Sequence, residues 1–106
     1  MMAGALSLPV VWSEDGGPTQ PGRLDLTAER LHFDGGSRNE PYTRDIALSK
    51  IESVRIARRP VERLSGRSAL VVELRDGRRV SIASLDRPGT LLEFAERLQQ
   101  AIGLSP

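Results

Sequence analysis

The sequence lacks cysteine and contains very few aromatic residues and histidines. Its 106 residues include no cysteine, one histidine, one tryptophan, one tyrosine and two phenylalanines. The absence of cysteine excludes a disulfide framework, a thiol nucleophile and thiolate zinc sites, and it is compatible with a reducing compartment. The single histidine, His32, excludes most imidazole-based metal sites. The function classes that remain are binding, scaffolding and carboxylate chemistry.

Long apolar runs are missing as well. No stretch approaches the roughly 18 apolar residues of a membrane-spanning helix, and residues 1–9 show no basic segment followed by a long apolar one. We therefore expect a cytoplasmic protein, with a peripheral position at the inner face of the membrane as the alternative. A chain of this length suits one domain with its own core, so we expect a single domain over residues 1–106, with residues 1–5 frayed.

Catalytic motifs are not found. The sequence contains no H-E-x-x-H, no G-x-S-x-G and no glycine-rich phosphate loop. The Asp-Gly-Gly sequences at 15–17 and 34–36 are interpreted as turns, because a calcium loop needs further oxygen ligands at set spacing. His32 lies between two apolar residues and should point away from the core. We expect neither an enzyme nor a bound metal or cofactor.

Apolar and polar residues alternate with a period of two along most of the chain, which predicts a sheet with one buried face. Asp76-Gly77 is the strongest hairpin signal, whereas Ala28-Glu29 is not a preferred turn pair. Seven strands are predicted between the clusters of glycine, proline and acidic residues, at residues 6–13, 22–27, 30–33, 42–48, 51–58, 69–75 and 79–83.

The period changes after Ser84 to that of a helix. Four apolar residues at helical spacing predict an amphipathic helix over about residues 88–102: Leu91, Ala95, Leu98 and Ile102. Thr90 and Glu93 have the spacing of a capping box, and Gly103 suits the position after the last turn. The apolar stripe of this helix should cover one open end of a curved antiparallel barrel.

The net charge of +1 conceals an asymmetry between the two halves of the chain. Residues 1–45 carry four arginines against seven acids, and residues 46–106 carry eleven basic residues against seven acids. Several guanidinium groups together suit an acidic partner, a phosphate group or a membrane surface. The alternative is a solvated loop in which arginines pair with Glu52, Glu62 or Glu73. The densest basic stretch comprises Arg55, Arg58, Arg59, Arg63 and Arg67.

A second candidate surface is apolar. Alternation places Val71 on the outward face of its strand, and the first strand carries Val10, Val11 and Trp12. If the first strand forms an exposed edge, these residues invite the addition of a strand from a peptide or a second copy. The alternative places Trp12 in the core.

Two segments carry longer motifs. Residues 22–33 read GRLDLTAERLHF and residues 46–54 read IALSKIESV. They resemble the G-x-L-x-L-T-x-x-R-L-x-F hairpin and the I-x-L-x-x-I-x-x-V strand, corner and strand of the pleckstrin-homology-like (PH-like) superfamily, in its GRAM and bacterial PH-like branches. The resemblance extends to the last hairpin and the terminal helix. It implies a mainly β (α+β) fold, a seven-stranded antiparallel barrel of two packed sheets capped by one C-terminal α-helix.

Two departures from the PH pattern refine the expected function. The terminal helix has no tryptophan, so Phe94 or Leu98 should close the barrel, which favours the GRAM-like branch. The region between the first two strands contains two acids, Glu14 and Asp15, and only one distant arginine, which makes a poor site for an inositol phosphate. We expect a non-enzymatic interaction module that binds a protein partner or itself and no nucleic acid. The alternative is a peripheral membrane module that binds anionic lipid through the five arginines.

Overall fold

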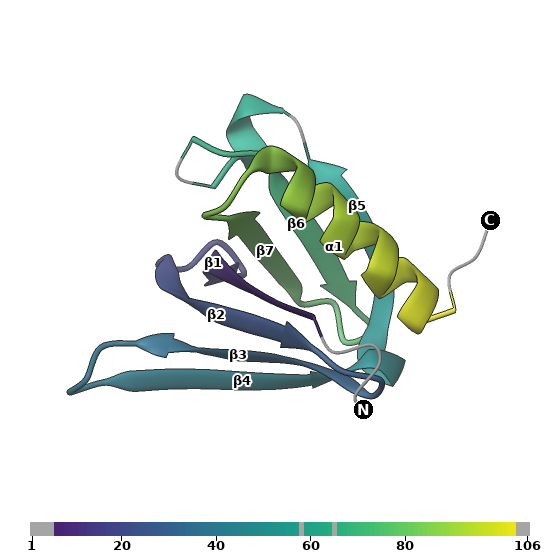
Figure 1. Cartoon of the computed structure of the whole chain (residues 1–106), viewed down its shortest axis with the longest axis horizontal. Coiled ribbons are helices and arrows are strands. Elements are labelled where there is room, and N and C mark those ends of the chain that lie inside the picture. Colours follow the sequence, from purple (N-terminus) through teal and green to yellow (C-terminus); the bar gives the residue numbers. More distant parts are fainter. Residues whose placement is uncertain (1–5, 58, 65, 104–106) are drawn as a thin grey trace.

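A computed structural model describes residues 6–57, 59–64 and 66–103 (Figure 1). Within these residues the chain forms seven antiparallel strands and a C-terminal helix, which confirms the predicted order. Residues 1–5, predicted to be frayed, lie outside the described ranges. The elements are β1 (Leu6–Glu14), β2 (Gln20–Leu26), β3 (Arg30–Gly36), β4 (Pro41–Ala47), the 3-10 helix η1 (Leu48–Lys50), β5 (Ile51–Ala57), the 3-10 helix η2 (Pro60–Glu62), β6 (Ala69–Leu74), β7 (Arg79–Ser84) and α1 (Pro88–Ala101).

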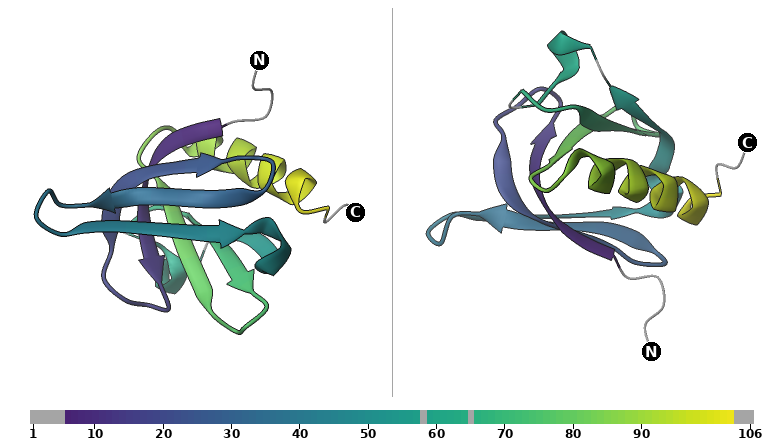
Figure 2. Two further views of the ribbon diagram at one scale, coloured as in Figure 1. Left: turned by 90° about the horizontal axis from the view of Figure 1, so that it is seen from below. Right: turned by 45° about the horizontal axis from the view of Figure 1, so that its top comes forward.

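The strands form one curled sheet in the order β4-β3-β2-β1-β7-β6-β5. β1 pairs with β2 along most of its length, and Val10–Glu14 also pair with β7. Strand β1 therefore joins two halves, and Figure 2 shows β2–β4 running at a steep angle to β6 and β7. The two packed sheets of the prediction are these halves of a single sheet.

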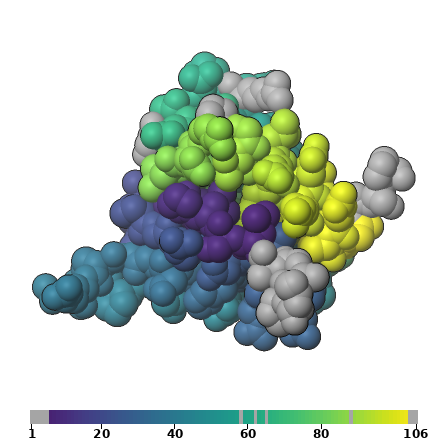
Figure 3. All heavy atoms as spheres, viewed as in Figure 1, coloured from purple at the N-terminus to yellow at the C-terminus, as the bar shows by residue number. Residues whose placement is uncertain are grey.

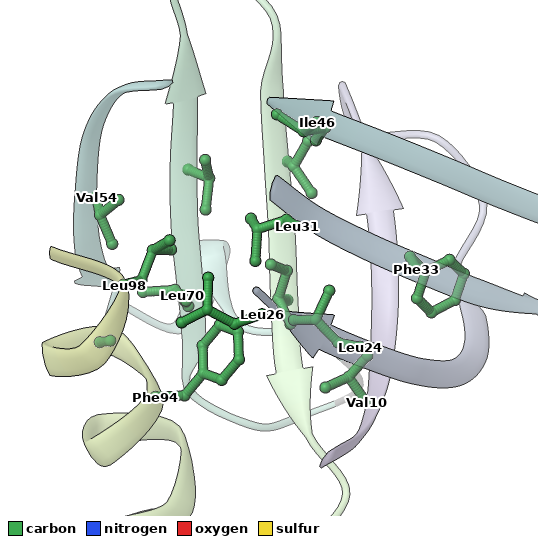
Figure 4. Close-up of a cluster of buried hydrophobic side chains, with 14 of the residues drawn as sticks. Val10, Leu24, Leu26, Leu31, Phe33, Ile46, Val54, Leu70, Phe94 and Leu98 are labelled. Carbon is green, nitrogen blue, oxygen red and sulfur yellow. The ribbon is translucent and has the colours of Figure 1, made fainter. Parts of the chain in front are cut away.

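The core lies inside the curl, where the predicted inward faces meet. Side chains from every strand and from α1 form one buried cluster. Phe94 and Leu98 of α1 are fully buried, and Figure 4 shows Phe94 pointing from the helix toward Leu70 and Leu26. Both residues that were expected to close the barrel therefore do so.

The ends of α1 differ in how well they match the sequence pattern. The helix begins at Pro88, its N-cap residue is Arg87, and no side chain caps it, so the predicted capping box of Thr90 and Glu93 is wrong. Proline suits the first helical position because that position needs no N–H donor, and this moves the start upstream of Thr90. Gly103 follows the C-cap with a φ of +76°, as predicted.

The two Asp-Gly-Gly sequences have different structures. Asp15 and Gly16 have φ values of 51° and 74° and form a tight turn, as expected. The second sequence is not a turn, because Asp34, Gly35 and Gly36 continue β3. A Cβ atom on Gly35 would lie 2.6 Å from Cζ of Phe33, so only glycine leaves room for that ring.

Candidate functional site

The predicted arginine stretch lies at the end of β5 and in the β5–β6 loop. Arg55 is an exposed residue of β5, and Arg59, Arg63 and Arg67 are exposed in the loop. Arg58 lies outside the described residues. The structure therefore places three of the five arginines on the same loop, although it does not bring Arg55 into the groove described next.

The backbone of the loop folds back on itself. Leu64 and Arg67 form an isolated bridge, with N–H to O distances of 2.9 and 3.0 Å in the two directions. Gly66, between them, has a φ of +77°, a left-handed conformation that glycine adopts without steric cost. This turn brings the arginines on its two sides, Arg63 and Arg67, to the same groove.

The groove has a volume of about 290 Å³ and is lined by both guanidinium-bearing residues and by Ser68, Ser84, Asp86 and Leu91. Nη1 of Arg67 donates to the carbonyl oxygen of Ser84 at 3.3 Å. Arginine presents five N–H donors, so this bond leaves others for an acceptor in the groove. The position of Leu91, at the buried face of α1, gives the groove an apolar part.

Three large apolar side chains are exposed at the same end of the barrel. The exposed fractions are 87% for Val61, 41% for Leu85 and 49% for Leu92. These residues belong to η2, to the segment after β7 and to the first turns of α1, which lie together at the top of Figure 1 and in the teal and light-green region of Figure 3. We call the following set the β5–β6 surface: Arg59, Val61, Arg63, Arg67, Leu85 and Leu92.

The structure bears in part on the alternative that the arginines of the loop pair with nearby acids. Glu73 accepts hydrogen bonds from Nη2 of Arg79 at 3.1 Å and from the hydroxyl of Ser53 at 3.5 Å. Its carboxylate is therefore already engaged by a β7 residue. The side chain of Glu62, the nearest acid in sequence, lies outside the described side chains.

The predicted apolar edge is wrong. Strand β1 lies in the middle of the sheet, and the two edges are β4 and β5. Val11 and Trp12 are buried, and Val71 is only 2% exposed. All of Ala69–Val72 are buried, so both faces of this part of β6 are covered and alternation alone does not mark an outward face. The alternative that placed Trp12 in the core is confirmed.

The acids between β1 and β2 have structural partners. Glu14 is only 20% exposed; it forms an ion pair with Nε of Arg44 and accepts from Nε1 of Trp12 at 3.4 Å. Oδ1 of Asp15 accepts from the backbone N–H of Arg79 at 2.9 Å. The sequence showed these acids, but their partners are 30 and 64 positions away, so no local pattern revealed the pairing.

An aromatic stack lies beneath this ion pair. The rings of Trp12 and Phe33 are stacked with centroids 4.8 Å apart, and Tyr42 meets Phe33 edge-on at 6.1 Å. Burial raises the pKa of the Tyr42 hydroxyl above its usual value, and the carboxylate of Glu14 raises it further. The hydrogen bond to Glu14 also raises the pKa of Arg44, so this guanidinium stays charged. We call these five residues the aromatic–ionic plug.

His32 behaves as the alternation predicted. It lies on the outer face of β3, where its Nδ1 is 2.8 Å from Oδ1 of Asp45 on the neighbouring strand. Across the described ranges, no three histidine, aspartate or glutamate side chains are grouped closely enough to hold a metal ion. The same residues contain no helix with the length and apolar character needed to cross a membrane.

Solved structures with the same arrangement of strands and helix are PH domains among others. The N-terminal PH domain of Vps36 matches with a TM-score of 0.72 at 16% identity, over 98% of this chain and 83% of that one. The PH domain of USP37 matches with a TM-score of 0.59 at 16% identity, over 95% of each chain. A chain of the 8S snRNP assembly intermediate matches with a TM-score of 0.76 at 12% identity, over 100% of this chain and 87% of that one.

Sequence comparison is less informative. No family model matches the sequence, and no curated protein matches it. The structural matches are below 25% identity, and they show the fold. The chain has a PH-like fold, as the motifs at residues 22–33 and 46–54 predicted.

Proposed function

We propose that this chain is a non-enzymatic PH-like interaction module, of the GRAM-like or bacterial PH-like type, that binds a protein partner or a second copy of itself through the β5–β6 surface. The observation that carries the proposal is the presence of three exposed apolar side chains on the segments that also form a groove lined by two arginines. Isolated exposed apolar residues are ordinary, whereas several together beside arginines are typical of binding surfaces.

The chemistry of the surface indicates an acidic partner with an apolar contact residue. A guanidinium group can bind a carboxylate through two parallel hydrogen bonds, and arginine is enriched at the energetic centres of interfaces. Arg63 and Arg67 would contact the carboxylates, while Val61, Leu85 and Leu92 would cover apolar atoms of the partner. Because exposed charges are screened by ions, affinity should fall as salt is added.

One observation supports the alternative, a peripheral membrane module. Val61 is 87% exposed in η2, with Arg59 and Arg63 on its two sides in the sequence. An apolar side chain between two cations can enter the headgroup region of an anionic membrane while the cations contact phosphates. On this alternative the protein would lie at the inner face of the membrane, and on the main proposal it would be cytoplasmic.

The proposal is tested by placing a photo-crosslinking amino acid at position 61 of the full chain in cells. We expect a covalent adduct with a discrete protein, and loss of that adduct when Arg63→Glu and Arg67→Glu are added. Arg38→Glu with Arg97→Glu is the matched control, because it changes the net charge equally at two other exposed positions. Absence of any adduct, or equal loss in the control, would contradict the proposal.

Two further measurements separate the partners. Sedimentation with phosphatidylserine-containing vesicles at low salt should leave the protein in the supernatant; binding that disappears in Arg63→Glu/Arg67→Glu would instead establish the lipid alternative. Light scattering on a sizing column then tests self-association. A concentration-dependent dimer that the same double variant converts to a monomer would identify the partner as a second copy.

A further inference from the structure

Strand β4 is an open edge of the sheet. It pairs with β3 on one side, and none of the described residues pairs with it on the other side (Figure 1). The N–H of Leu48 donates to the carbonyl of Glu29 at 3.0 Å, and this fixes which residues bond to β3. Antiparallel strands exchange hydrogen bonds at every second pair, so the N–H and C=O groups of Asp45 and the N–H of Ala47 point to the open side, while the C=O of Ala47 begins η1.

The other edge of the sheet is not equally available. Strand β5 lies along α1, and Nε2 of Gln99 donates to the carbonyl oxygen of Val54 at 3.2 Å. A register shift between Ile51 and Ser53 also interrupts the regular backbone of β5. A partner strand would therefore find a more regular row of backbone groups along β4.

A groove of about 570 Å³ runs beside the open edge of β4 and reaches η1 and the β6–β7 hairpin. Ile46 and Leu74, both nearly fully buried, supply its apolar lining. The hairpin is tied to η1 because Nε of Arg75 donates to the carbonyl of Ser49 at 3.0 Å. We call this feature the β4 groove.

The β4 groove has an excess of positive charge. Lys50, Arg75 and Arg78 line it, and among the described residues no carboxylate forms an ion pair with Lys50 or Arg75. The two acids of the lining have partners of their own. Asp45 is 2.8 Å from Nδ1 of His32, and Asp76 accepts from the backbone N–H of Arg78 at 3.0 Å.

From these observations we infer that the β4 groove binds an acidic, extended segment of a partner protein, which adds to β4 as an eighth strand. Backbone groups of Asp45 and Ala47 would supply main-chain hydrogen bonds, and Ile46 and Leu74 would contact alternate apolar side chains. Lys50, Arg75 and Arg78 would contact the carboxylates. A compact anion would contact the cations alone, whereas an added strand would contact the open backbone groups, the apolar lining and the cations.

This surface is distinct from the β5–β6 surface. Strand β6 begins beside the β5–β6 loop and ends at the β6–β7 hairpin, so the two surfaces lie at opposite ends of it (Figure 1). The inference therefore does not depend on the function proposed above. Variants at Arg63 and Arg67 should leave binding at β4 unchanged.

The test uses the full chain and a fluorescently labelled peptide of alternating glutamate and valine, about six residues long, the length of an ordinary strand. Binding is followed by fluorescence anisotropy at low salt. The decisive variant is Ala47→Pro, because Ala47 already has a φ of −64°, which suits proline. It removes one N–H donor from the open edge without changing a charge, and circular dichroism checks that the fold is kept.

We expect Ala47→Pro to weaken peptide binding roughly tenfold, the loss of one well-made hydrogen bond and of the fit beside it. Lys50→Gln with Arg78→Gln should weaken binding and reduce its salt dependence, and Arg38→Gln with Arg97→Gln, at two exposed positions outside the β4 groove, should match the wild type. A peptide methylated at alternate backbone nitrogens should lose affinity for the unaltered protein as well. This last comparison holds even if a protein variant fails to fold.

Four results would overturn the inference. The first is no peptide binding at low salt. The second is that the methylated peptide binds the unaltered protein as tightly as the unmethylated peptide does, and that Ala47→Pro binds the unmethylated peptide as tightly as the wild type does. The groove would then act through charge alone. The third is binding to anionic vesicles that Lys50→Gln/Arg78→Gln abolishes and Ala47→Pro does not affect. The fourth is a wild-type dimer that Ala47→Pro converts to a monomer, because β4 would then pair with a second copy.

Discussion

Two regions of the molecule, the aromatic–ionic plug and the β5–β6 surface, use their charged residues in opposite ways. In the plug, Glu14 is paired with Arg44, and the adjacent Asp15 binds the backbone of the next hairpin. In the β5–β6 surface, Arg59 and Arg63 are exposed, beside apolar side chains that are also exposed. The charges of the plug hold strands together, and those of the β5–β6 surface are presented to solvent.

A count of charges along the chain therefore does not identify those that can bind a partner. Residues 1–45 are acidic in sum, yet two of their acids are held by Arg44 and by the backbone of Arg79. We therefore expect substitutions in the plug to change the stability of the fold, and substitutions in the β5–β6 surface to change binding.

The largest effect is expected for Phe33→Ala in the plug. Phe33 is fully buried and stacks on Trp12, so its removal leaves a cavity and should lower the free energy of unfolding by about 3–5 kcal/mol. Val61→Ala in the β5–β6 surface is the matched apolar control and should change it by no more than about 0.5 kcal/mol. Urea unfolding measures both. Similar losses of unfolding free energy in the two variants would contradict the expectation that the plug, and not the β5–β6 surface, stabilises the fold.

A smaller effect is expected for Glu14→Gln. The substitution leaves the partly buried guanidinium of Arg44 without its carboxylate and should lower the free energy of unfolding by about 1–2 kcal/mol, since solvent screens part of the charge. Glu29→Gln, at an exposed turn, is the isosteric control. If both variants unfold at the wild-type urea concentration, the ion pair contributes nothing to the plug.

The pH dependence of the plug follows from Tyr42, the only tyrosine of the chain. Burial and the carboxylate of Glu14 raise its pKa in the folded state above the usual value, so the folded protein binds the phenolic proton more tightly than the unfolded chain does. This stabilisation is complete below the unfolded pKa and is lost as pH rises through the folded pKa. The tyrosinate absorbance should therefore titrate above the value for free tyrosine.

Tyr42→Phe provides the control for this titration. Its free energy of unfolding should fall less steeply than that of the wild type as pH rises above 10, because the titrating hydroxyl is gone. Parallel pH profiles for the two proteins, or a tyrosinate titration at the ordinary pKa, would show that burial and Glu14 do not raise the pKa of Tyr42.

The smallest effect on stability is expected for Arg63→Gln with Arg67→Gln. Both residues are exposed, and among the described residues their guanidinium groups make one hydrogen bond, the 3.3 Å contact from Nη1 of Arg67 to the carbonyl oxygen of Ser84. The free energy of unfolding measured in urea should change by about 0.5 kcal/mol or less. Crosslinking from position 61 should be lost. A large loss of stability would place these arginines among the structural charges, like those of the plug.

Sequence patterns predicted the elements well because a strand or a helix is set by neighbours a few positions apart. The alternation around Phe33 and the helical spacing around Phe94 each express a single buried face, and both residues are in the core. The same reasoning failed at Val71, because it assumes one buried face for each strand. That residue is covered on the opposite face as well.

The candidate sites were predicted less completely. The arginine stretch was visible in the sequence, whereas the exposed Leu85 and Leu92 beside it come from segments that follow it by some twenty residues or more and meet it only in the fold. The β4 groove had no sequence signal at all. Its cations come from η1 and the β6–β7 hairpin, and its edge is open only because β1, and not β4, lies in the middle of the sheet.

By itself, the sequence determined the order of seven strands and one helix, the residues of the core and the absence of thiol chemistry, since these follow from composition and local periodicity. Tertiary structure decided which strands are edges, which acids are paired and which arginines share a groove. These properties depend on contacts between distant segments: Glu14 meets Arg44 across the curl of the sheet, and Arg75 reaches Ser49 because β6 pairs with β5. Only the folded sheet brings such groups together.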